Sequence, residues 1–283
     1  MLELVFIMRI GASYNFFDGE EILPYSVKSI RNSVSYIVVV YQEISNYGNN
    51  ISKEAKKVLK NLLDKKMVDD VILYKPGNIG RGAVNETRKR NIGLQLCRNN
   101  KCSHYLTIDA DELYDEEEFN KAASIISSKG FYGSFCLFRD YFKYPTYQMI
   151  DNKPMTKQKN KSQRTSIPFL FKITNDTKHF HGAYNHIDWF KLLVDPTRMI
   201  IPLEKNHIKY FSPKELMMHH MSWVRKNITS KVENSSCNDS PQFRDRKEKI
   251  KKLYSSWDIG KSCPFAPPKN KINIVENKFG VKI

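Results

Sequence analysis

Three carboxylates stand within four residues in the stretch "HYLTIDADELY" (104–114), directly after an apolar run. Asp109 and Asp111 are two residues apart, so in an extended chain their side chains point the same way and can serve one ligand. Such oxygen ligands suit Mg²⁺ or Mn²⁺, which proteins often share with the phosphates of a substrate. The alternative is that these acidic residues only cap a helix that begins near Asp115. The elements around the stretch decide between the two.

Apolar runs and amphipathic segments alternate before these carboxylates. Strands are predicted at 2–8, 35–41, 68–74 and 104–109, and helices at 19–34, 51–66 and 83–100, with Ser52 as the N-cap of the second helix. This order is typical of an α/β fold with a doubly wound, mostly parallel sheet flanked by helices. Such sheets bind ligands at the carboxyl ends of their strands, which is where Asp109 and Asp111 stand.

The regular alternation of strands and helices ends after a predicted helix at 114–130, whose first turn is acidic. Strands are predicted at 133–145 and 166–174, a polar basic loop at 151–166, a helix at 211–234, and a proline-interrupted tail at 261–283 that wraps the surface. The chain shows no convincing linker. We therefore predict one continuous domain, with an α/β half at 1–142 and a second half with a C-terminal helical extension at 143–283.

The positive charge is concentrated in the second half. The net charge is +16, with 19 Lys and Arg against 18 Asp and Glu up to Phe142, and 27 against 12 from Lys143 onward. One interpretation is a lysine-rich solvated surface. The other is a field that attracts a polyanion, such as nucleic acid, a phosphorylated glycan or an anionic membrane face.

Composition narrows the class of protein and its compartment. The 283 residues are 41% hydrophobic and 27% charged, as in ordinary globular proteins. The chain has no apolar run near the roughly 18 residues of a membrane helix and no basic leader of a signal peptide. Five scattered cysteines without a CxxC pair indicate reduced thiols. Together these features predict a cytoplasmic protein.

The stretch "TRKRNIGLQLC…HYLTIDADELY" resembles the GT-A glycosyltransferases, in particular family-2-like enzymes, with their Arg-Asn-x-Gly helix, hydrophobic strand and Asp-x-Asp. The resemblance covers roughly the first 140 residues. It implies a GT-A fold and a nucleotide-sugar donor, with a nucleotide-sugar-binding half at 1–142 and an acceptor-binding half at 143–283. It also implies that Asp111 coordinates a Mn²⁺ or Mg²⁺ that bridges the donor diphosphate. Asp109 would contact the ribose or sugar, or reach the metal through water. Arg90 would lie near the nucleotide.

One position departs from that family. Its members commonly carry an acidic residue for the nucleotide base at the end of the second strand, where this chain has Tyr41 and Gln42, with Glu43 as the nearest acid. Gln42 can still hydrogen-bond a base and Tyr41 can stack on it. The identity of the base stays open.

The second half is expected to complete the site. On the predicted helix at 211–234, His219 and His220 point about 100° apart, so only one of them can reach the metal, and we favour His220. By the resemblance, a downstream histidine completes the metal shell; the alternative is a helix that only packs. His181, His186 and Trp189 fall in a dense segment that suits a sugar or acceptor platform, or else forms a structural turn.

These features favour a metal-dependent glycosyltransferase, a hexosyl- or pentosyltransferase that by the resemblance is inverting. Inversion needs a carboxylate base for the acceptor hydroxyl; Asp188 is our candidate, and Asp140 and Glu215 compete with it. The charge favours an anionic acceptor, either DNA with a hydroxymethylated base or a surface glycan or its lipid carrier. The alternative functions are a Mg²⁺-dependent nuclease or nucleic-acid-binding protein on an α/β fold, and a purely binding role.

Overall fold

The computed structural model describes residues 8–77, 81–150, 156–158, 161–163, 166–180, 198–201, 207–259 and 271–283. Its strands are β1 (Ile10–Phe16), β2 (Tyr36–Tyr41), β3 (Asp70–Leu73), β4 (His104–Asp109), β5 (Glu112–Tyr114), β6 (Gly133–Phe142), β7 (Tyr147–Ile150), β8 (Thr156–Gln158), β9 (Lys161–Gln163), β10 (Ile167–Lys172), β11 (Lys178–His179), β12 (Ile200–Ile201), β13 (Ile208–Tyr210), β14 (Met217–Trp223) and β15 (Lys271–Ile274). Its helices are α1 (Leu23–Ile30), α2 (Lys53–Asp64), α3 (Gly82–Asn99), α4 (Glu116–Lys129), α5 (Ile228–Asn234), α6 (Pro241–Arg244) and α7 (Lys247–Ser255), with short 3₁₀ turns η1 (Arg31–Ser33) and η5 (Ser236–Asp239).

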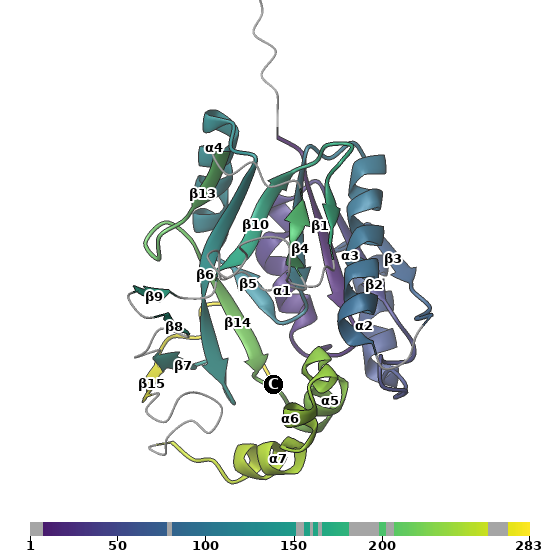
Figure 1. Ribbon diagram of the computed structural model, residues 1–283, viewed down its shortest axis with the longest axis vertical. Helices are drawn as coiled ribbons and strands as arrows, with labels where there is room; N and C mark the ends of the chain where they lie inside the picture. The colour runs from purple at the N-terminus through teal and green to yellow at the C-terminus, as the bar shows by residue number, and fades with distance from the viewer. Residues whose placement is uncertain are drawn as a thin grey trace, which may run out of the picture.

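One large sheet forms the frame of the molecule (Figure 1). Its order is β15-β7-β6-β10-β4-β1-β2-β3, in which β3, β2, β1 and β4 are parallel and β10 is antiparallel to both β4 and β6. The chain leaves β1 towards β2 and β3, and returns to the other side of β1 with β4. This reversal is a topological switch point, the position at which open α/β sheets bind ligands. The predicted α/β fold class is confirmed and is consistent with a Rossmann-like GT-A fold.

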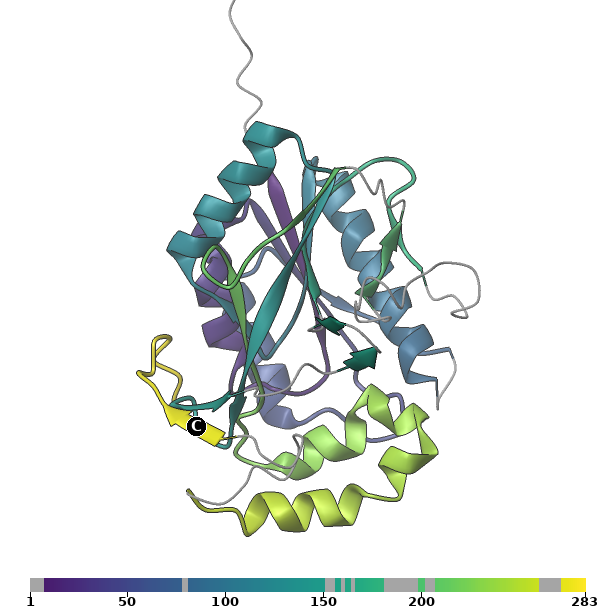
Figure 2. The same cartoon turned by 60° about the vertical axis from the view of Figure 1, so that its left-hand side comes forward.

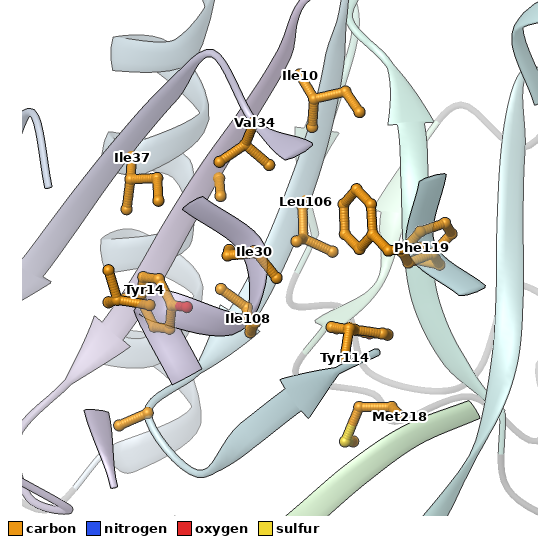
Figure 3. Packing of buried hydrophobic residues seen from close by; sticks show 14 of the residues in the cluster. Ile10, Tyr14, Ile30, Val34, Ile37, Leu106, Ile108, Tyr114, Phe119 and Met218 are labelled. Carbon is orange, nitrogen blue, oxygen red and sulfur yellow. The ribbon is translucent and has the colours of Figure 1, made fainter. Parts of the chain in front are cut away.

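Helices cover both faces of this sheet because its central strands are apolar on both sides. On β2, Ile37 and Val39 pack in the cluster that holds the buried residues of α1, α2 and α4, while Val38 and Val40 pack in a second cluster with Leu94 of α3. Successive side chains of a strand point to opposite faces, so a run of buried residues needs cover on each. Figure 3 shows the first cluster, in which Ile37, Leu106 and Phe119 lie among side chains from strands and helices.

The first strand lies further along the chain than predicted. The sequence predicted it at 2–8, of which 2–7 lie outside the described residues and Met8 belongs to no strand, whereas β1 spans Ile10–Phe16. The small residues of "IGASYNF" hide this strand from a search for apolar runs. They are small because α3 packs very close to β1: a Cβ on Gly93 would overlap the side chain of Ser13.

The predicted helix at 211–234 is wrong. Its first part is strand β14, which pairs parallel with β6 and antiparallel with β5, and the helix α5 begins only at Ile228. A strand that is mostly buried on both faces shows no alternation, so its apolar run resembles a buried helix in the sequence. As a consequence, the neighbouring histidines of β14 point to opposite faces rather than about 100° apart.

The other predicted strands and helices agree with the structure to within a few residues where it describes them, whereas the predicted loop and tail contain strands. Ser52 caps α2 by accepting a hydrogen bond from the backbone N–H of Ala55 at 2.9 Å. In the predicted loop at 151–166, the described part contains the hairpin β8–β9, and in the predicted tail β15 pairs antiparallel with β7. Among the described residues, no helix has the length and apolar character that crossing a membrane requires.

The C-terminal helices lie across one end of the sheet. Figures 1 and 2 show α5, α6 and α7 together below the end at which β1 and β2 finish. The short pairing of β14 with β5 brings them there, because β5 follows the Asp-x-Asp stretch directly and α5 follows β14. The carboxyl ends of the parallel strands therefore face a lid of residues from the second half of the chain.

Candidate functional site

A cavity of about 150 Å³ opens where the parallel strands end. Asn15 of β1 lies directly beside Asp109 of β4 in the register of the sheet, and Gln42 follows the last residue of β2. All three line the cavity, together with Lys89 of α3 and Lys231 of α5. The cavity thus combines the switch point of the first half with the helical lid of the second.

Asp109 is held by two arginines. Arg90, 2% exposed, donates to Asp109 Oδ1 at 3.0 Å and to Thr107 Oγ1 at 2.7 Å, and Arg198 donates to Asp109 Oδ2. Arg198 also pairs with the buried Glu112. Burial opposes ionisation of Asp109, but Arg198 and Arg90 overcome it and hold the pKa of Asp109 below its ordinary value. Arg90 therefore holds Asp109 in position and does not itself line the cavity.

Asp111 is 4% exposed and is held by two further cations. Arg225 Nη2 lies 2.6 Å from Asp111 Oδ2, and Lys231 Nζ lies 3.1 Å from the same oxygen. Burial alone would raise the pKa of Asp111, but Lys231 and Arg225 hold it far below its ordinary value. The backbone carbonyl of Asp111 also accepts from the N–H of Met221, so β14 runs directly beside this residue and carries the chain on to Arg225.

The two histidines of β14 have different surroundings. His220 faces Asp111, with Nε2 at 3.9 Å from Asp111 Oδ1, and its Nδ1 hydrogen-bonds Asp140 Oδ1 at 2.7 Å. His219 lies on the opposite face, where it hydrogen-bonds Tyr141 and where burial lowers its pKa to about 3. His220, which the sequence analysis favoured, is the histidine that lies beside Asp111, although the helix on which that preference rested is a strand. Its role as a metal ligand stays a prediction.

The predicted metal ligands Asp109, Asp111 and His220 lie in one region but do not form a metal shell. Asp109, Asp111 and Glu112 pair with four cationic side chains, Arg90, Arg198, Arg225 and Lys231, and Arg225 also lies 3.9 Å from Glu21. The oxygens of Asp109 and Asp111 are therefore engaged by cationic side chains, and the carboxylates of Asp18 and Glu86 also line the cavity. In the part of the chain that the structure describes, no three His, Cys, Asp or Glu side chains form a group that could hold a metal ion. The metal stays a prediction from sequence.

Lys89 is buried without a close partner. It is 3% exposed and lines the cavity, and it makes no hydrogen bond or ion pair with any described residue. Burial lowers its pKa to about 8, against the opposing attraction of Glu86. Lysine is almost never fully buried unless it is paired. A buried ammonium group that lines a cavity is therefore suited to an anionic ligand.

Two amide oxygens of the cavity also lack partners among the described residues. Gln42 is 1% exposed; its Nε2 donates to Asn46 Oδ1 at 3.2 Å, while its Oε1 accepts no hydrogen bond, and neither does Asn15 Oδ1. Buried polar groups without partners are few in native proteins, and each calls for an explanation. Tyr41, predicted to stack on a base, does not line the cavity and instead packs half-buried against the core.

The predicted acceptor-side residues His181, His186 and Trp189 and the predicted base Asp188 lie outside the described residues. Of the two competing bases, Asp140 hydrogen-bonds His220 beside Asp111. Glu215 pairs with Lys209 at 2.7 Å and accepts from the backbone N–H of Ser212 at 2.8 Å, which stabilises its own turn.

The sequence did not point to Arg198, Arg225 or Lys231. They lie 89, 114 and 120 positions from the aspartates that they contact. The only signal in the sequence was the excess of positive charge in the second half. That excess did not single out any position.

Comparisons with known proteins find likeness in structure alone. No protein-family model matches the chain, and no curated protein matches its sequence. Residues 1–349 of S. aureus TarS in complex with UDP-GlcNAc are 12% identical, with a TM-score of 0.46, and the alignment covers 88% of this chain and 73% of that one. A mannosyltransferase from Pyrobaculum calidifontis in complex with GDP-Man and Mn²⁺ is 14% identical, with a TM-score of 0.34 over 46% and 36% of the two chains.

The chain spans 38% of a longer S. aureus TarS structure, which is 11% identical with a TM-score of 0.44. These structural neighbours are glycosyltransferases, the class that the sequence resemblance predicts. At TM-scores below 0.5 the likenesses carry no argument about a residue or a substrate. The function proposed next therefore depends on the geometry of the cavity.

Proposed function

We propose that this protein transfers a sugar from a nucleotide-sugar donor to a hydroxyl group of an acceptor. The observation that carries the proposal is the cavity at the switch point, which combines buried amide oxygens without partners among the described residues with the two lysines Lys89 and Lys231. A nucleotide base offers N–H groups to the free oxygens of Gln42 and Asn15. A diphosphate is the anion that suits the cationic side chains.

In the transfer, an acceptor oxygen attacks the anomeric carbon and the bond from that carbon to the diphosphate breaks. The electron pair stays on the diphosphate oxygen, and the proton of the acceptor passes to a carboxylate base. Cations beside the leaving group stabilise the charge that develops on it. Asp188 remains the proposed base from the sequence, and inversion at the anomeric carbon remains the expectation from the resemblance.

The acceptor is proposed to be anionic because the second half of the chain carries most of the positive charge. DNA with a hydroxymethylated base would bind more weakly as salt increases, since each neutralised phosphate releases counterions. A surface glycan on a lipid carrier would instead lead to binding of anionic vesicles. The nuclease alternative is weaker, because its catalytic metal needs carboxylates that are free, and those of Asp109 and Asp111 are paired with cations.

The test is the thermal midpoint of the whole chain with UDP-, GDP-, CDP- and TDP-linked sugars. A ligand that binds only the folded state raises the midpoint. We expect one base to stabilise the protein more than the others, and Gln42→Ala to reduce that shift. If none of the nucleotide sugars raises the midpoint and duplex DNA does, the proposal is wrong and the nucleic-acid alternative is favoured.

A further inference from the structure

The lysines of the cavity come from two elements that face it from different halves of the chain. Lys89 belongs to α3, which packs tightly on β1 through Gly93, and Lys231 belongs to α5. Both line the cavity next to Asp109 and Asp111. They belong to separate elements, so each lysine can be substituted without changing the other.

Lys231 shares its carboxylate partner with Arg225. Asp111 provides one negative charge, and both Arg225 and Lys231 contact the same oxygen, Oδ2. Arg225 is almost fully buried, while the side chain of Lys231 is 24% exposed. The guanidinium therefore serves as the internal partner of Asp111, and the ammonium group remains available to a ligand in the cavity.

Lys89 supplies the second charge. It is buried and has no hydrogen bond or ion pair with any described residue, and the attraction of Glu86, Asp109 and Asp18 offsets only part of the cost of its burial. A ligand with negative charge in the cavity would provide a close partner. The diphosphate of a nucleotide sugar carries two negative charges, and Lys89 and Lys231 are the cationic side chains among the described residues that line the cavity.

We propose that Lys89 and Lys231 bind the donor diphosphate directly, with Asp111 and Arg225 as positioning residues for Lys231, so that donor binding does not require a divalent cation. The inference rests on the proposed function in one respect, that the ligand is a nucleoside diphosphate derivative. When the bond from the anomeric carbon to the diphosphate oxygen breaks, the electron pair adds one negative charge to the diphosphate. The ammonium group of Lys231 stabilises that charge, and the acceptor proton goes to the base.

The experiment is isothermal titration calorimetry of the whole chain with UDP, GDP, CDP and TDP and with the matching monophosphates, in EDTA and then in Mn²⁺. In EDTA we expect one diphosphate to bind, and to bind more tightly than its monophosphate. Lys89→Met and Lys231→Met should each weaken that diphosphate about tenfold or more, since each removes a hydrogen bond between charged groups. The exposed Lys57 is the matched control, and Lys57→Met should bind like the wild type.

Two results would overturn the inference and leave the proposed function standing. One is diphosphate binding that appears only with Mn²⁺, and the other is wild-type affinity in both lysine variants. Circular dichroism and the unfolding midpoint of each variant show that it is folded. If none of the diphosphates binds with or without Mn²⁺, the proposed function fails together with the inference.

Discussion

Replacing Lys89 by methionine should make the folded protein more stable while it weakens the binding of nucleoside diphosphates. Methionine keeps an unbranched side chain of similar length and removes the charge. A residue that serves the fold loses stability when its polar group is removed, whereas a residue that serves a ligand can gain stability. The two roles therefore predict opposite signs for one substitution.

The magnitude follows from the pKa of Lys89, which burial lowers from 10.5 to about 8. A shift of this size corresponds to about 3 kcal/mol, since one pKa unit corresponds to about 1.4 kcal/mol. Between these two pH values the unfolded chain binds the proton and the folded chain does not, so the stability of the wild type rises with pH. The penalty is present in full below pH 8 and disappears above the unfolded pKa.

The assay is urea unfolding of the wild type and Lys89→Met at pH 7 and at pH values up to about 10.5, with Lys57→Met as the control. We expect Lys89→Met to exceed the wild type by up to about 3 kcal/mol at pH 7, and this difference to shrink as the pH rises through the range from 8 to 10.5. The control should show no such trend. A variant that is less stable than the wild type at pH 7, or a difference that does not change with pH, would refute the reasoning.

Three further predictions test other contacts of the site. Asp111→Asn leaves the cations beside it without their carboxylate and should cost about 3–5 kcal/mol in the free energy of unfolding, measured in urea; a cost below about 1 kcal/mol would show that these pairs are not buried as described. Gly93→Ala should destabilise the protein by about 1–3 kcal/mol, measured by thermal unfolding, because the new Cβ overlaps Ser13. Adding Ser13→Gly should recover part of the lost stability, and no recovery would show that the strain lies elsewhere. Gln42→Ala should weaken the preferred nucleotide by about tenfold in calorimetry while inorganic diphosphate binds as before, and equal loss for both ligands would contradict a role in base binding.

The order of strands and helices could be predicted because most helices of the first half carry one apolar stripe. Strand β4 and helix α3 were placed nearly to the residue. Strand β1 was misplaced because its small residues, selected by the close approach of α3, do not read as an apolar run. Strand β14 was mistaken for a helix because it lies between β5 and β6 and is mostly buried on both faces. Its sequence therefore does not alternate between apolar and polar residues.

The site could be predicted only where it is local in the sequence. Asp109 and Asp111 stand out because they are neighbours at the end of one strand. Their cationic partners do not stand out, because Arg225 and Lys231 come from a lid whose position depends on how β14 pairs. Ion pairs between residues more than 100 positions apart leave no local pattern, so the sequence alone favoured a metal where the structure places guanidinium and ammonium groups.

The measurement that tests the central claim most directly is the release of nucleoside diphosphate from the nucleotide sugar that stabilises the protein, followed by chromatography with water as the acceptor. We expect slow release by the wild type in EDTA, and loss of release in Lys231→Met although that variant is folded. A nucleotide sugar that stays intact, while the same preparation cleaves duplex DNA when Mg²⁺ is added, would contradict the account and show that the cavity serves phosphodiester chemistry.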